Sequence, residues 1–173
     1  MVTSSRGGQC CGLTATWFSP VSFEPPLLLV SLQHQTATAS GIEESRAFGV
    51  SVLSEKAQDL AARFGIAALD TKFDGISFQN GVCGCPLLRC AHVSMDCTLW
   101  GTWRVGDHIA YVGRVVGAEV SSVSNPLVQY EGAFLGLGLE PIDPGLRPVA
   151  DPAEDTVSHV ATSPFTGGEP HGA

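Results

Sequence analysis

Residues 12–27 read Gly-Leu-Thr-Ala-Thr-Trp-Phe-Ser-Pro-Val-Ser-Phe-Glu-Pro-Pro-Leu, and the interpretation of the whole chain starts from this stretch. Its first half is rich in Thr, Trp and Phe and predicts a strand over residues 13–19. Four side chains in the stretch carry hydroxyl groups that can donate hydrogen bonds to a ligand: Thr14, Thr16, Ser19 and Ser22. The simpler alternative is an ordinary strand and turn, in which threonine serves β-propensity.

Similar β-rich runs follow along the chain and predict strands over 27–33, 48–53, 93–99 and 108–120. In 93–99, apolar and polar residues alternate, which predicts one buried and one exposed face. The run 108–120 is apolar on both faces, which is typical of a covered strand such as a barrel strand at a subunit contact.

Helical periodicity is confined to two places. Ala57, Leu60, Ala61 and Phe64 share one face of a helix that we expect Ser54 to cap and Gly65 to end. A second, short helix is expected over 42–46. Because most strands follow one another without a helix between them, the pattern predicts an antiparallel barrel with peripheral helices.

Composition limits the function classes. The 173 residues are 44% hydrophobic, enough for one substantial core. Only 15% are charged, below the roughly 25% usual in soluble proteins, which favours a homo-oligomer with covered surface. The net charge of −8 argues against nucleic-acid binding. No apolar run approaches the ~20 residues of a membrane helix, so we expect a cytoplasmic protein.

The last part of the chain differs from the rest. From Glu140 onward it is rich in Pro, Gly, Asp and Ser and poor in large apolar residues. We therefore expect one folded domain over residues 1–139 and a largely disordered acidic tail over 140–173.

Generic catalytic and metal signatures are missing from the sequence. Six cysteines are few for a disulfide scaffold, so reduced thiols are expected, and Cys83-Gly84-Cys85 is only half of a metal site. No metal site is predicted. Pro141 stands where the Gly136-Leu137-Gly138 run would need its third glycine, so a Rossmann dinucleotide site is excluded. These observations reach only an oligomeric β-barrel.

Four segments, in order, resemble the flavin reductase-like, FMN-binding split-barrel family. Residues 12–27 are similar to its flavin-binding strand and turn, and residues 47–54 with the following helix are similar to its next block. Gly84-Cys85-Pro86 resembles its Gly-x-Pro turn. Gly106-Asp107-His108, followed by Gly113, resembles its most diagnostic motif. The resemblance covers about residues 2 to 135.

The resemblance implies a mainly β, antiparallel split β-barrel of Greek-key type with short peripheral helices, in a homodimer. It also implies an NAD(P)H-dependent flavin reductase, which transfers hydride from NADH or NADPH to FMN or FAD. Reduced flavin would then leave for a partner monooxygenase. Because the two cofactors supply the chemistry, no acid/base pair is required, which agrees with the missing catalytic signatures.

Individual residues receive roles from the same resemblance. His108 is assigned to the nicotinamide side as the catalytic residue; without the family, a lone His after a Gly-Asp turn is more often a surface residue. Thr36 and Thr38 are assigned to the flavin phosphate at a helix N-terminus, although Thr38 or Ser40 could simply cap that helix. The full flavin-binding set is Thr14, Ala15, Thr16, Trp17, Phe18, Ser19, Val21, Thr36, Thr38, Ser54, Phe64 and Asp107.

Two alternatives remain open at this point. One is a non-catalytic flavin- or haem-binding split-barrel module, and the other is an interaction protein without a working site. Members of the family usually carry a further N-terminal helix and a Thr-Gly-Val strand, whereas this sequence begins at Met1-Val2-Thr3. We therefore expect either a start assigned too late or a shortened first strand that leaves an open sheet edge.

Overall fold

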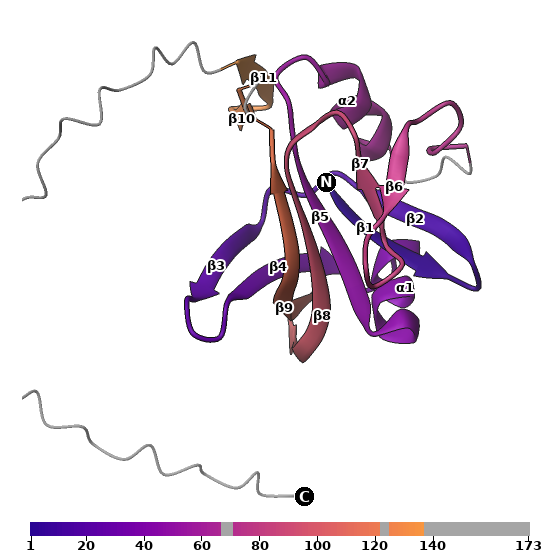
Figure 1. Cartoon of the computed structure of the whole chain (residues 1–173), viewed down its shortest axis with the longest axis vertical. Coiled ribbons are helices and arrows are strands. Elements are labelled where there is room, and N and C mark those ends of the chain that lie inside the picture. The colour runs from indigo at the N-terminus through magenta and orange to yellow at the C-terminus, as the bar shows by residue number, and fades with distance from the viewer. Residues whose placement is uncertain (67–70, 122–124, 137–173) are drawn as a thin grey trace, which may run out of the picture. The chain divides into compact units, whose positions relative to one another are not determined.

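The computed structural model describes residues 1–66, 71–121 and 125–136. The largest element of the fold is one antiparallel sheet of seven strands in the order β2-β1-β5-β8-β9-β4-β3 (Figure 1). Its strands are β1 (Val2–Arg6), β2 (Gln9–Leu13), β3 (Phe18–Ser22), β4 (Leu27–Gln33), β5 (Ala47–Leu53), β8 (Ala91–Val105) and β9 (His108–Val120). Two small hairpins, β6 (Phe78–Asn80) with β7 (Pro86–Leu88) and β10 (Leu127–Tyr130) with β11 (Ala133–Gly136), form separate two-stranded sheets.

The sheet curls without closing, which confirms the predicted antiparallel split barrel. Its two edges are β2 and β3, which follow each other in the chain but are the outermost strands of the sheet. Residues 14–17 connect them across the opening. The first strand, β1, is five residues long and pairs with both β2 and β5, so it is not itself an edge.

Several strand predictions are confirmed. Strands β4 and β9 have the predicted bounds, and β5 begins one residue earlier than expected. The continuous strand expected over 13–19 is wrong, because the chain leaves the sheet after Leu13 and returns at Phe18. Phe64 O accepts from Thr14 N at 3.2 Å, and Trp17 O accepts from Ser31 N at 2.9 Å, so tertiary hydrogen bonds fix the irregular segment.

The alternating pattern in 93–99 predicted one exposed face, and this is wrong for its first half. Ser94 and Asp96 are buried in β8, with Asp96 only 2% exposed. The loop before β7 covers this face, since Cys83 N donates to Asp96 Oδ2 at 2.8 Å. Polar identity alone therefore did not indicate exposure.

The first helix, α1 (Ala37–Ser45), is longer than the predicted range of 42–46 and starts earlier. Its cap is Thr36, whose Oγ1 accepts from Ala39 N at 3.1 Å. The two suggested caps, Thr38 and Ser40, lie inside the helix instead. Ile42 is fully buried and joins Phe48 and Tyr111 in the main core between α1 and the sheet.

The second helix, α2 (Gln58–Gly65), ends at the predicted glycine but is not capped by Ser54. Ser54 instead forms an isolated bridge with Pro126, while Ala57 occupies the cap position without a side-chain bond. Phe64 of α2 packs with Leu53 and Leu88 in a second core cluster. None of the described helices is long and apolar enough to cross a membrane. The predicted tail, 140–173, lies outside the described residues.

Candidate functional site

A cavity of about 560 Å³ lies where the sheet is split. Residues 12–17 supply one wall, and residues 31–33 of β4 supply another. The remaining wall comes from residues 35–38, which lead into α1, and from Phe64 and Gly65 at the end of α2. Lys72 and His108 complete it. The irregular segment that connects the two edge strands therefore lines the cavity. The volume of the cavity is in the range typical of small-molecule sites.

The structure brings eight of the predicted site residues to this cavity: Thr14, Ala15, Thr16, Trp17, Thr36, Thr38, Phe64 and His108. Five others do not line it. Phe18 lines a second, smaller cavity that also borders residues 14–16. Ser19 and Val21 are exposed on β3, Ser54 is buried beside Pro126, and Asp107 is exposed next to His108.

The link segment can offer a ligand backbone donors and the Thr16 hydroxyl, whereas the Thr14 hydroxyl is already committed. Thr14 Oγ1 donates to Ala61 O of α2 at 2.7 Å, so its proton holds the helix against the link. In contrast, the amides of Ala15, Thr16 and Trp17 meet no acceptor within the described part of the chain. These amides are therefore available to acceptor atoms of a ligand. The Trp17 side chain is 61% exposed and offers a flat apolar surface.

His108 is held in a defined orientation at the start of β9. Its Nδ1 donates to Asp107 Oδ1 at 2.7 Å, and its ring lies 4.8 Å from that of Trp17, tilted by 39°. The hydrogen bond from His108, followed by the charge of His108, lowers the pKa of Asp107 below its ordinary value. The ionised carboxylate thus occupies Nδ1, which leaves Nε2 as the ring nitrogen for a ligand.

The α1 N-terminus adds the partial positive charge of its unpaired amides to the same cavity. The Thr36 hydroxyl is committed to the helix, because it accepts from Ala39 N and donates to Gln33 O at 3.0 Å. The Thr38 side chain is buried. There is no acidic residue in the first turn of α1, so an anion approaching this end meets no nearby repulsion from it.

Four polar residues of the cavity wall were not among the predicted site residues: Ser31, Gln33, Gln35 and Lys72. Gln33 is the last residue of β4 and Gln35 follows it, and no pattern in the sequence marks either side chain as part of a site. Lys72 lies in an irregular segment after α2. Its only distinction in the sequence is rarity, since Lys56 is the other lysine of the chain.

Cysteine and metal chemistry have little support. Burial, with the charge of Asp96 as the second cause, raises the pKa of the Cys85 and Cys97 thiols to about 12. Both thiols are therefore protonated at neutral pH and poor nucleophiles. No group of three or more His, Cys, Asp or Glu that could hold a metal occurs among the residues described.

Comparison with known proteins identifies the family of the chain. Residues 1–138 match the family described as Flavin reductase like domain. The chain belongs to this family. The flavin reductase family accordingly accounts for the split barrel and for the order of the sequence blocks.

Three relatives illustrate the family. The reductase subunit HsaB of a flavin-dependent monooxygenase from Mycobacterium tuberculosis is 35% identical over 146 residues, which is 83% of this chain and 78% of that protein. An NADH-dependent flavin reductase from a Rhodococcus species is 34% identical, over 74% and 70% of the two chains. The solved structure of a nitrilotriacetate monooxygenase component B homologue from Mycobacterium thermoresistibile is 30% identical, with a TM-score of 0.77 over 90% and 87% of the chains.

Proposed function

We propose that this protein reduces a flavin with NADH or NADPH in the split cavity and supplies the reduced flavin to a partner monooxygenase. The chain is an oxidoreductase of the flavin reductase kind. One observation carries the assignment of the cavity: the Trp17–His108 pair and residues 15–17, whose amides have no acceptor in the described chain, line the same space. The named relatives support the partner, because HsaB is the reductase subunit of a monooxygenase.

The cavity fits an oxidised flavin, FMN or FAD, as substrate. The amides of residues 15–17 suit the carbonyl oxygens of the isoalloxazine ring, and the Trp17 side chain suits its flat face. We assign the flavin phosphate to the start of α1, where backbone amides of residues 37 and 38 remain for an anion. Thr36 contributes by capping the helix, and Thr14 by fixing α2, so both support the flavin through the backbone.

His108 is proposed to meet the nicotinamide. Its Nε2 can accept from the carboxamide NH₂ group, while Asp107 holds the ring from the other side as a positioning residue. Hydride passes from the nicotinamide to the flavin, and the protein contributes by stacking the two rings and excluding water. The described cavity wall contains no Asp or Glu, which agrees with a reaction that needs no carboxylate base.

Spectroscopy of the purified protein tests this function. We expect oxidation of NADH or NADPH to accelerate only when free FMN or FAD is added, and anaerobic mixtures to accumulate reduced flavin. A protein that binds flavin without any acceleration would be a binding module instead. A haem absorbance band, or no cofactor binding, would equally overturn the proposal.

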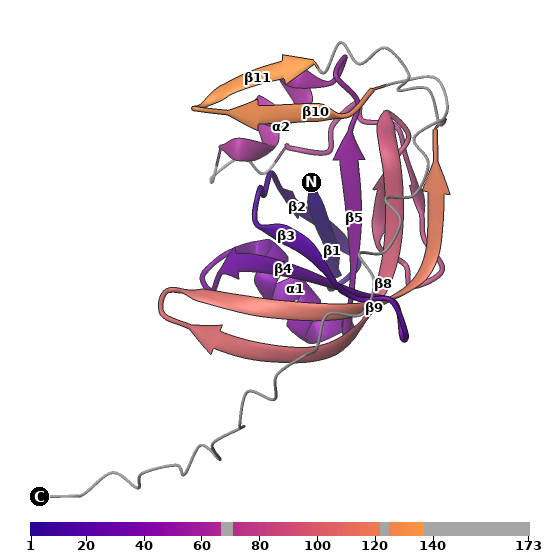
Figure 2. The ribbon, with the colours of Figure 1, turned by 90° about the vertical axis from the view of Figure 1, so that its left-hand side faces the viewer.

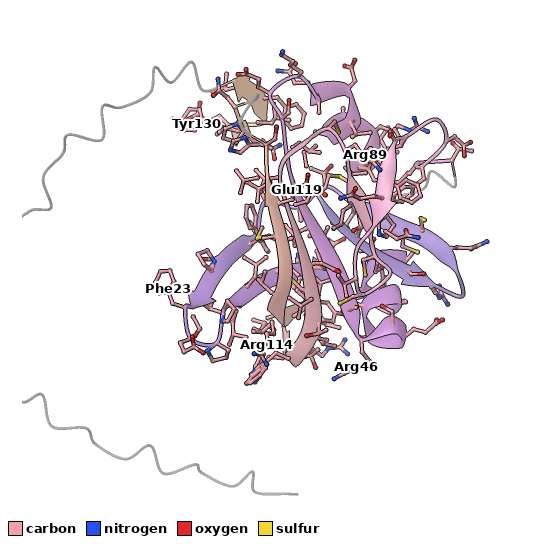
Figure 3. All side chains as sticks on the ribbon, in the orientation of Figure 1. Phe23, Arg46, Arg89, Arg114, Glu119 and Tyr130 are labelled. Atoms are coloured by element: carbon pink, nitrogen blue, oxygen red, sulfur yellow. The ribbon has the colours of Figure 1, made fainter. Side chains whose placement is uncertain are left out.

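We also propose a homodimer in the cytoplasm, in which a second copy covers the distal parts of β8 and β9, the two longest strands (Figure 2). Trp103, which lies on β8 near its turn into β9, is more than half exposed in the single chain. Phe23, at the tip of the β3–β4 hairpin, is 95% exposed and points away from the body (Figure 3). A second copy is favoured because few charged residues cover the chain, only 15%, as is typical of obligate interfaces.

Light scattering after gel filtration is expected to give twice the 18.1 kDa of one chain. Replacing Trp103 by Glu should dissociate the dimer, because the buried carboxylate would lack a partner. The matched control is Val82→Glu, which places a carboxylate at an apolar residue that is 89% exposed in the loop before β7. A monomeric wild type would refute the dimer, and an unaltered mass in Trp103→Glu would refute the chosen face.

A further inference from the structure

The wall of the cavity has a charge composition unlike that of the chain. The sequence has 17 acidic residues against nine Lys and Arg. Nevertheless no Asp or Glu lines the described wall, and Lys72 is its only Lys or Arg. The described wall of this net acidic protein thus holds an ammonium group and no carboxylate, which favours an anionic ligand.

Local contacts hold the Lys72 segment against the end of α2. Arg63 Nη2 donates to Thr71 O on one side of Lys72. On the other side, the Phe73 ring meets Phe64 edge-on, with centroids 5.0 Å apart at 86°. Lys72 is therefore fixed through both of its sequence neighbours, so its side chain projects from an anchored backbone.

The ammonium group itself is only weakly satisfied. Among the described residues it donates one hydrogen bond, to Phe64 O at 3.4 Å, while a lysine has three N–H donors. Partial burial lowers the pKa of Lys72 below its ordinary value. An ammonium in this state gains most from a charged acceptor.

We propose that Lys72 binds a phosphate group of one of the two nucleotide substrates and makes the enzyme prefer phosphorylated over phosphate-free ligands. This rests on the proposed function, because the flavin and the reduced nicotinamide dinucleotide are the two phosphate sources. Both present the same chemistry, a phosphate oxygen that accepts from an ammonium. The wall offers no other Lys or Arg in its described part that could replace Lys72.

The test uses Lys72→Met, which keeps the length and apolar body of the side chain and removes its charge. Lys56→Met is the matched control, because Lys56 is the other lysine, is exposed, and does not line the cavity. Lys72→Arg is the conservative variant that keeps a cation. Thermal unfolding of all three variants excludes a loss of fold.

Two arms separate the phosphate sources. In the first, fluorescence titration compares FMN with riboflavin, which lacks the phosphate. In the second, steady-state kinetics at saturating flavin compare NADH with N-benzyl-dihydronicotinamide, a hydride donor without phosphate. Raising the salt concentration should weaken the phosphate contact in the wild type and have less effect on Lys72→Met.

Loss of one charge-assisted hydrogen bond should lower the affinity for the phosphorylated ligand about tenfold. If FMN loses affinity and riboflavin does not, the flavin is the source; if only the KM for NADH rises, the dinucleotide is the source. Lys72→Arg should retain most of the affinity, and Lys56→Met should match the wild type. Equal losses for phosphorylated and phosphate-free ligands, or no loss at all, would overturn the role of Lys72. A wild type that fails to oxidise NADH would instead refute the proposed function.

Discussion

Gly113→Ala is expected to lower the free energy of unfolding by about 2 to 3 kcal/mol, as overpacked cores do. A Cβ at Gly113 of β9 would lie 2.4 Å from Phe48 Cζ and 2.8 Å from Cys97 Cβ. Phe48 and Cys97 are fully buried, so neither can move into solvent to relieve the contact. The glycine of this motif is thus required by the packing of the core beneath β9.

Gly117→Ala is the control, because it makes the same change four residues later on the same strand. There the added Cβ would meet only Asp96 Cβ, at 3.9 Å, which is ordinary van der Waals contact. Guanidinium chloride unfolding of both variants measures the difference directly. If Gly113→Ala is no less stable than Gly117→Ala, the Phe48 ring does not limit the space at Gly113.

The parts of the fold that the sequence predicted are those in which local pattern and tertiary environment agree. β9 was predicted with its bounds because thirteen largely apolar residues follow the Gly106 turn. α1 was only half predicted, since its first turn of small residues, Ala-Thr-Ala-Ser-Gly, has no apolar periodicity. The Thr36 hydroxyl, which accepts from Ala39 N, decides where that helix begins.

The break in the strand at residues 14–17 could not be predicted from local propensity. Its hydrogen-bond partners are Phe64 O, fifty residues along the chain, and Ser31 N of β4. The break also explains why only some of the residues predicted in this motif line the main cavity. Once the chain has left the sheet and returned, Phe18 faces a different cavity from Trp17, so a contiguous motif is divided between two spaces.

Lys72 shows the complementary limit of sequence reasoning. Its segment lacks periodicity, and its place at the cavity depends on Phe73 packing against Phe64 and on Arg63 reaching the Thr71 carbonyl. These are side-chain contacts between a helix and an irregular loop, for which no sequence spacing is diagnostic. By comparison, His108 was predicted because the consecutive residues Gly106-Asp107-His108 resemble a family motif, and its side chain does line the cavity.

His108→Ala is expected to lower kcat/KM for the nicotinamide substrate about tenfold, which corresponds to the loss of one hydrogen bond to a polar ligand. The variant removes Nε2 and the ring that lies 4.8 Å from Trp17. The amides of residues 15–17 and the start of α1 remain, so the affinity for flavin should change much less. Asp107→Asn should have a smaller effect of the same kind, because Asp107 lies outside the cavity and acts only through His108 Nδ1.

Steady-state kinetics with NADH varied at saturating flavin, together with flavin titration of the same variant, separates the two effects. His34→Ala is the matched control: His34 lies beside the same turn, and its backbone N–H donates to Asp107 O at 3.4 Å, but its side chain does not line the cavity. That variant should keep wild-type kinetics, since alanine retains the backbone donor. If His108→Ala keeps normal nicotinamide kinetics, or loses activity mainly because flavin no longer binds, His108 does not act on the nicotinamide.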